Sequence, residues 1–95
     1  MKLEVLVTTM HCNDLSIYKR MNLQTDAIIA NQCDNDEVLC EVIDNHNVKM
    51  VSTNTRGVSL NRNIAINHST ADYILFSDDD LIFNNGYEKE INDEF

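Results

Sequence analysis

The sequence contains no proline and no tryptophan, and Gly57 and Gly86 are its only glycines. Because it has so few of the residues that end helices and strands, no segment is typical of a flexible linker. A chain of 95 residues can close one hydrophobic core but not two. We therefore expect residues 1–95 to form a single continuous domain.

Basic residues are also scarce, with 7 Lys and Arg against 16 Asp and Glu, which gives a net charge of −9. This field repels the phosphates of nucleic acids and the headgroups of anionic lipids. The apolar runs are only a few residues long, whereas a membrane-spanning helix needs about 20 residues. We expect a soluble protein that has no transmembrane segment and binds no nucleic acid.

The sequence has an odd number of cysteines, Cys12, Cys33 and Cys40, and no secretory leader. A disulfide framework is therefore disfavoured, and a reducing cytoplasm is the expected location. Cys33 and Cys40 could bind zinc together with His46, but their spacing does not match that of structural zinc sites. We interpret them as ordinary, partly buried thiols.

Two apolar segments, Leu3–Thr8 and Asp26–Asn31, predict buried parallel strands, the first of them central in a sheet. Asp14 can cap a helix between these strands. The apolar residues of this predicted helix recur with helical spacing, at Leu15, Tyr18 and Met21. Strand, helix and strand in this order open a βαβ unit.

The segments Val38–Ile43 and Val48–Ser52 flank a run of turn residues and favour a hairpin, although Val38–Ile43 also fits a helix. Tyr73–Ser77 predicts a third buried strand. Helices are expected over Ser59–His68 and after Gly86, where Tyr87, Ile91 and Phe95 share one face. The predicted fold is an α/β three-layer sandwich with a mainly parallel sheet.

Three adjacent carboxylates, Asp78, Asp79 and Asp80, follow the predicted third strand. They repel one another unless a cation compensates, and oxygen ligands at the carboxyl edge of a parallel sheet suit magnesium or manganese. In an extended chain Asp78 and Asp80 would share a face, and Asp79 would point away. The alternative is that these residues simply end the strand and cap a turn.

Arg56 and Arg62 lie on either side of Gly57, at the predicted start of the helix from Ser59. Backbone N–H groups at a helix start favour anions, so a diphosphate could bind there. A salt bridge to one of the many acidic residues is an equal alternative for Arg56. The sequence has no P-loop, no glycine-rich dinucleotide loop and no EF-hand loop.

The segments Val5–Thr9, Arg56–Ala65 and Ala71–Asp80 together resemble the family 2 glycosyltransferases of the GT-A fold. In that family a Gly-x-x-x-x-Arg-Asn helix precedes a hydrophobic strand that ends in an Asp-x-Asp (DXD) type motif. The resemblance implies a Rossmann-like nucleotide-binding half. It also implies that Asp78 and Asp80 hold a divalent metal ion, manganese or magnesium, which bridges the diphosphate of the donor.

The resemblance further implies that Thr8, Gln32 and Arg62 line the pocket of the nucleotide base, and that Asp79 contacts the ribose or the sugar. The family usually has an acidic pair where this sequence has Asn31-Gln32. The amide of Gln32 could still bond a pyrimidine edge, because it has both a donor and an acceptor. The expected partner is a nucleoside diphosphate sugar, with uridine as the base.

The chain ends 15 residues after Asp80, and the acceptor-binding half and catalytic base of the family lie beyond that motif. We therefore expect residues 1–95 to be the N-terminal, donor-binding part of a glycosyltransferase domain, with no residue assigned as catalytic base. Whether the chain alone is an enzyme stays open. Apolar surface exposed by an incomplete domain favours self-association.

Three other functions remain open. The chain could be a non-catalytic nucleotide-binding module or an acidic interaction module whose aspartates are simply solvated. A nucleotidyltransferase is less favoured, because Thr8–Asp14 lacks the expected glycine-rich, lysine-containing loop.

Overall fold

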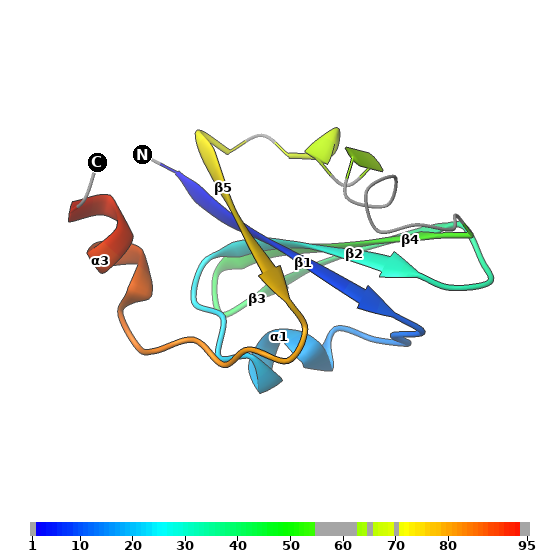
Figure 1. Ribbon diagram of the computed structural model, residues 1–95, viewed down its shortest axis with the longest axis horizontal. Helices are drawn as coiled ribbons and strands as arrows, with labels where there is room; N and C mark the ends of the chain where they lie inside the picture. Colours follow the sequence, from blue (N-terminus) through cyan, green and yellow to red (C-terminus); the bar gives the residue numbers. More distant parts are fainter. Residues whose placement is uncertain (1, 55–62, 65, 70, 94–95) are drawn as a thin grey trace.

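A five-stranded sheet forms the centre of the molecule (Figure 1). The computed structural model describes residues 2–54, 63–64, 66–69 and 71–93. Their elements follow in the order β1 (Leu3–Met10), α1 (Ser16–Arg20), β2 (Asp26–Gln32), β3 (Glu37–Ile43), β4 (His46–Thr53), β5 (Tyr73–Asp78) and α3 (Tyr87–Asp93).

The strands lie in the order β3-β4-β2-β1-β5. β1 is parallel to both β2 and β5, and β2 is parallel to β4, whereas β3 is antiparallel to β4. The mainly parallel α/β sheet and the interior position of β1 confirm the predictions from the sequence. Four strands therefore end at the same edge of the sheet.

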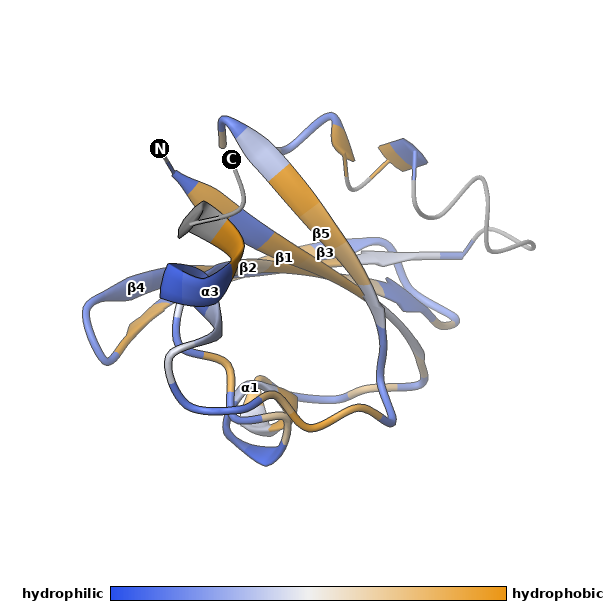
Figure 2. Cartoon of the chain, turned by 60° about the vertical axis from the view of Figure 1, so that its left-hand side comes forward, coloured by the Kyte–Doolittle hydropathy of each residue, from blue (hydrophilic) through white to orange (hydrophobic). Residues whose placement is uncertain are grey.

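Apolar side chains pack on both faces of the sheet, which explains why β1 and β2 are almost continuously apolar. Val5, Val7 and Ile29 pack on one face with α1 and with Tyr87 of α3. Leu6 and Ile28 pack on the other face with Ile64 and Ile66. Figures 1 and 2 show α1 on one side of the sheet and the short helical pieces that precede β5 on the other side.

The predicted hairpin is confirmed, because β3 and β4 pair around a two-residue turn at Asp44 and Asn45. Both residues have positive φ angles, 51° and 68°. This conformation twists the backbone in the sense of the flanking strands, and Asp and Asn tolerate it better than most residues. The turn residues thus decide between the helix and the strand that the apolar pattern left open.

The first helix differs from its prediction at its start. α1 begins at Ser16 after Leu15, which makes no side-chain cap bond. Asp14 lies one residue earlier and accepts a hydrogen bond from the Ser16 N–H at 3.0 Å, so its carboxylate closes a turn before the helix. Hydrogen bonding to Ser16 lowers the pKa of Asp14. The apolar face is as predicted, with Tyr18 and Met21 buried.

The prediction that Tyr73–Ser77 is a buried strand is wrong in one respect. β5 forms where expected, but it lies at the edge of the sheet, and Phe76 is 49% exposed. An apolar run predicts a strand from its local pattern, whereas the neighbours of that strand depend on the topology.

The helix expected after Gly86 is confirmed as α3, with Tyr87 buried and Ile91 packed against the core. Phe95 lies outside the described residues. Within the predicted helix Ser59–His68, residues 63, 64 and 66 have helical backbone, and the start of that helix also lies outside the described part. No helix in the described ranges combines the length and the apolar character that crossing a bilayer requires.

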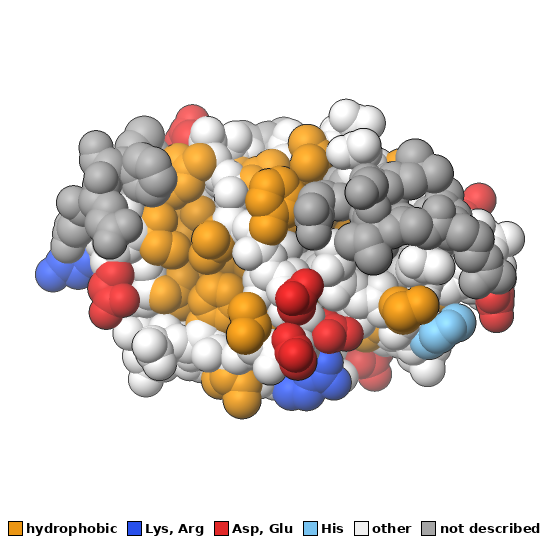
Figure 3. All heavy atoms as spheres, viewed as in Figure 1, with side chains coloured by type: hydrophobic (Ala, Val, Ile, Leu, Met, Phe, Trp, Pro, Cys, Tyr) orange, Lys and Arg blue, Asp and Glu red, His pale blue; other side chains and the backbone are white. Residues whose placement is uncertain are grey.

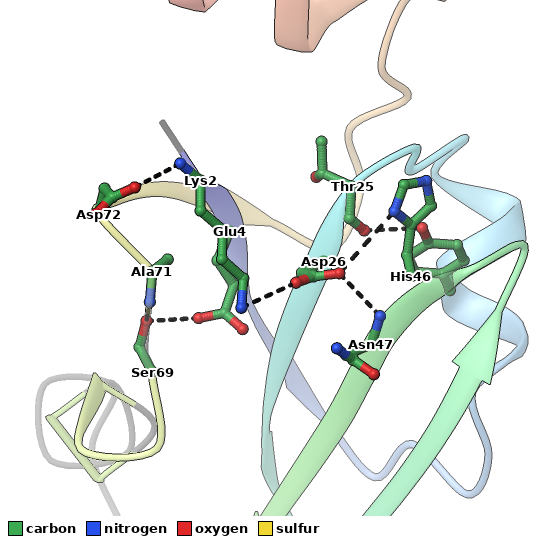
Figure 4. Close-up of polar contacts among 10 residues, drawn as sticks. Lys2, Glu4, Thr25, Asp26, His46, Asn47, Ser69, Ala71 and Asp72 are labelled. Atoms are coloured by element: carbon green, nitrogen blue, oxygen red, sulfur yellow. Dashed lines mark hydrogen bonds and ion pairs between the residues drawn. The ribbon is translucent and has the colours of Figure 1, made fainter.

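The four parallel strands begin at the amino edge of the sheet, opposite the edge where they end. Charged and polar contacts hold this amino edge together (Figure 4). Asp26, at the start of β2, pairs with Lys2 at 3.3 Å and accepts a hydrogen bond from the Asn47 N–H at 2.8 Å. Glu4 accepts a hydrogen bond from the Ser69 hydroxyl. These contacts tie β1, β2, β4 and the segment before β5 together, so this edge has a structural role.

Candidate functional site

The carboxyl ends of the four parallel strands form the edge at which an open α/β sheet binds ligands. Thr8 of β1 lies opposite Asp78 of β5, and Met10 lies opposite Gln32 of β2. Alternation along the strands places Thr8, Gln32 and Asp78 on the same face as buried Leu6. Three residues predicted for the site therefore share one face at one edge.

Asp79 points to the other face. β5 ends at Asp78, and Asp79 and Asp80 form a turn rather than an extended chain. The Thr9 hydroxyl donates a hydrogen bond of 2.8 Å to the Asp79 carboxylate. Asp79 thus points away from the face of Asp78, as predicted. The prediction that Asp80 shares a face with Asp78 is wrong, because the backbone turns after Asp78 and Asp80 lines the same groove as Asp79. Asp79 is fixed by this bond, whereas Asp78 and Asp80 are exposed.

A groove of about 380 Å³ adjoins the aspartate turn on the side of α1. Its lining residues are Arg20, Met21, Asp79, Asp80, Leu81 and Ile82. Figure 3 shows acidic side chains gathered below the centre of the molecule, with a basic group beneath them and hydrophobic side chains beside them. The groove therefore joins carboxylates, a guanidinium group and an apolar wall.

A second, polar cavity of about 210 Å³ lies where the loops after β1 and β2 meet the hairpin. Its residues include His11, Cys12, Asn31, Cys33 and Ser52. Thr8 and Gln32 lie near this edge but do not line the cavity.

Asn31 organises this cavity and is only 1% exposed. Its amide oxygen accepts a bond from the Cys12 N–H at 3.0 Å, and its nitrogen donates to the Cys12 carbonyl at 2.8 Å and to the Ser52 hydroxyl at 3.0 Å. One buried side chain thus connects the loop after β1 to both β2 and β4.

The oxygen groups at the turn suit a hard divalent ion. Neither Asp78 nor Asp80 makes an ion pair or a side-chain hydrogen bond with another residue in the described part of the chain. Magnesium commonly uses one or two carboxylates and completes its shell with water and substrate phosphates. No group of three or more His, Cys, Asp or Glu residues among those described could hold an ion. Asp78 lies on the face of Leu6 and Asp80 lines the groove beside α1, so an ion shared by these two aspartates would need further oxygen atoms from a ligand.

Two predicted residues cannot be placed in this site. Arg62, predicted to line the base pocket, and Arg56, the alternative anion contact, both lie outside the described residues. Ile64 and Ile66, shortly after Arg62 in the sequence, pack on the sheet face that carries Thr8 and Asp78.

The structure defines an α/β protein whose polar and acidic residues gather at the carboxyl edge of a mainly parallel sheet. Residues 15–91, most of the chain, match the family model for glycosyl transferase family 2. The chain belongs to this family, whose general activity is glycosyl transfer from nucleotide-sugar donors. Searches of curated proteins and of solved structures found no significant match.

Three residues that shape this edge, Thr9, Arg20 and Asn31, are not among the site residues predicted from the sequence. Asn31 is a polar residue inside an apolar strand, which is itself an indication of a specific buried contact. Thr9 follows Thr8 directly, and alternation along β1 could have assigned it to the opposite face. Arg20 had no such indication, because its proximity to Asp79 and Asp80 depends on the path of the chain after β5.

Proposed function

We propose that this chain binds a nucleoside diphosphate sugar, with uridine as the base, through a manganese or magnesium ion held by Asp78 and Asp80. The supporting observation is that Asp78, the last residue of β5, lies opposite Thr8 near the end of β1, that Asp80 follows in the next turn, and that both carboxylates are exposed. When bound, the ion supplies Lewis-acid stabilisation of the charge on the departing diphosphate.

The other residues act by positioning. Thr8, Gln32 and Arg62 are proposed to line the base, and Asp79 to contact the ribose or sugar. The hydrogen bond from Thr9 supports this role, because it holds the Asp79 carboxylate in one orientation. Pre-formed contacts of this kind reduce the entropy lost when a ligand binds.

We further propose that residues 1–95 form the donor-binding part of a GT-A domain built in three layers. Packing of Ile64 and Ile66 on one sheet face, with α1 and α3 on the other, supports the layers. The acceptor half and the catalytic base are proposed to come from polypeptide outside this chain. We also propose, from the sequence, that the protein is cytoplasmic and that the chain self-associates.

Calorimetric titration with uridine diphosphate, with and without manganese, tests this function. We expect binding that requires manganese and is lost in Asp80→Ala. Glu41→Ala removes an exposed carboxylate from β3, at the opposite edge of the sheet from β5, and should bind like the wild type. Binding that is independent of metal, or equally weak in both variants, would contradict the proposal.

The acidic interaction module remains the second function, because the Asp78 and Asp80 carboxylates are exposed. It predicts that Asp78→Asn with Asp80→Asn leaves the protein unchanged or stabilises it by relieving repulsion, and that no nucleotide binds. A non-catalytic nucleotide-binding module would instead bind uridine diphosphate and manganese without turning over a sugar donor. Assaying donor hydrolysis in the same samples separates these functions.

A further inference from the structure

β3 is an edge strand that carries an apolar stripe. It pairs with β4 on one side and, among the described residues, with no strand on the other. Alternation along β3 places Val38, Cys40 and Val42 on one face of the sheet. Val38 is 51% exposed and Val42 is 70% exposed, and Cys40 between them is exposed as well. An exposed edge strand of this kind is a template for pairing with another strand.

The backbone groups of the same three residues face the open edge. In an antiparallel ladder, every second residue of a strand directs both its N–H and its C=O to one neighbouring strand. In a two-residue hairpin the residues that flank the turn form a bonded pair, which here is Ile43 with His46. Counting back along β3 in steps of two, Val42, Cys40 and Val38 therefore direct their N–H and C=O groups away from β4.

We propose that β3 pairs antiparallel with β3 of a second copy of this chain, in the register centred on Cys40. The inference rests on the self-association proposed above and assigns a surface to it. In this register Cys40 lies opposite the partner's Cys40, and Val38 lies opposite the partner's Val42. Each outward-facing N–H and C=O group of these residues then meets an outward-facing group of the other copy. The valines cover one another, and β-branched pairs of this kind stabilise a sheet.

The two glutamates of β3 favour this register over its neighbours. Glu37 and Glu41 lie on the face opposite Cys40. In the centred register Glu41 lies opposite the partner's Leu39, and Glu37 lies opposite the partner's Ile43. Sliding one strand by two residues in either direction would place two glutamates directly opposite each other, which is destabilising. The strand is therefore complementary to itself in the centred register only.

The net charge of −9 on each copy opposes this pairing. Salt screens the repulsion, because the screening length falls from about 30 Å at about 0.01 M to about 10 Å at about 0.1 M. We therefore expect the dissociation constant of the dimer to fall severalfold over this range of sodium chloride.

Sedimentation equilibrium over a range of protein concentrations tests the surface. We expect a species of twice the mass of one chain, and Val42→Lys should raise its dissociation constant by about tenfold, because two-fold symmetry repeats the change at both ends of the interface. The added lysine makes the net charge less negative, so greater repulsion between the copies cannot explain such a loss. Val38→Lys is the second variant in case the first does not fold.

Ile82→Lys is the matched control, because Ile82 is a 75% exposed aliphatic residue outside the sheet. This variant should dimerise like the wild type. A dimer that persists in Val42→Lys, or one that is lost equally in Ile82→Lys, would overturn the β3 surface while leaving self-association itself intact. A monomer at every salt concentration would overturn both.

Thiol crosslinking tests the register. Residues opposite each other in a bonded antiparallel pair have Cα atoms about 5.5 Å apart. A chain whose only thiol is Cys40, made by Cys12→Ser with Cys33→Ser, should form a covalent dimer with 1,2-ethanediyl bismethanethiosulfonate, a short bifunctional thiol reagent. A chain that keeps only Cys33 should not. Equal crosslinking of the two chains would contradict the register centred on Cys40.

Discussion

Asn31 shows how one buried polar residue organises the site edge. Its amide makes three hydrogen bonds that join the loop after β1 to β2 and β4. A buried amide with all these partners specifies one loop conformation, because a different conformation would leave polar atoms without bonds. The residue combines a stability role with a role in shaping the polar cavity.

Replacing this amide with a carboxylate of the same size should be costly. Asn31→Asp removes both N–H donors and brings a negative charge against the Cys12 carbonyl, so we expect the free energy of unfolding to fall by about 1–3 kcal/mol. Urea denaturation measures this loss. Asn35→Asp makes the same change at an exposed position and should be nearly neutral. Similar losses in the two variants would contradict the role assigned to Asn31.

Tyr18 and Tyr87 are buried, and the protein should therefore lose stability at alkaline pH. Burial raises the pKa of both Tyr18 and Tyr87, because it disfavours the phenolate. Their contribution is therefore fully present below the unfolded-state pKa of about 10 and is lost as pH rises above it. We expect the free energy of unfolding to decline above about pH 10.

Tyr18→Phe tests this linkage. The variant loses the hydrogen bond of 2.8 Å to the Thr25 carbonyl, which should cost about 1 kcal/mol near pH 7. Its decline above pH 10 should be shallower than that of the wild type. Denaturation curves at several pH values give both slopes, and parallel slopes would show that Tyr18 does not contribute.

Among the elements, the β3–β4 hairpin depends most clearly on its turn. Asp44 and Asn45 both have left-handed backbone conformations, which cost most L-residues about 1–2 kcal/mol. The hairpin pairs β3 with β4 and thereby forms one edge of the sheet. A local change at the turn should therefore alter the stability of the whole edge.

Asn45→Gly should stabilise the protein by up to about 1 kcal/mol, because glycine adopts positive φ without a steric penalty. Asn45→Ala should destabilise it by a similar amount. Thermal unfolding of both variants measures the difference. If the two variants shift the midpoint in the same direction, turn strain is not the cause.

At the scale of the whole molecule, the net charge of −9 should oppose folding, because the acidic groups lie closer together in the folded chain. Raising salt from 0.01 to 0.1 M shortens the screening length from about 30 to about 10 Å. We expect the unfolding midpoint to rise with sodium chloride. Glu41→Lys, at an exposed position of β3, makes the net charge less negative. The unfolding midpoint of this variant should therefore depend less on salt. An equal dependence would point to a general effect of salt.

The acidic residues at the two edges of the sheet differ in whether they are paired. The amino edge is held by internal pairs such as Lys2–Asp26, whereas the carboxylates of Asp78 and Asp80 at the carboxyl edge have no partner among the described residues. The ion pair at the amino edge joins parts of the fold, whereas exposed carboxylates at the carboxyl edge are accessible to a cation. The same molecule therefore uses acidic residues for stability at one edge and for proposed binding at the other.

The sequence by itself determined most of the elements and their order. Continuous apolar runs mark β1 and β2 because both faces of these strands are buried, and the turn residues Asp44 and Asn45 favour the hairpin. These properties depend on local pattern, which the chain carries in its residue types. The Gly57 to Arg62 spacing and the aspartates after β5 likewise led to the family that the comparison confirms.

Only the tertiary structure decided which residues meet. That β5 lies at the edge, that Asp79 bonds Thr9, and that Arg20 lies in the groove with Leu81 and Ile82 all depend on contacts between distant segments. No local periodicity reports such contacts, because they arise from strand order and from the path of the chain between elements. The division of the carboxyl edge into two faces is thus a property of the folded sheet.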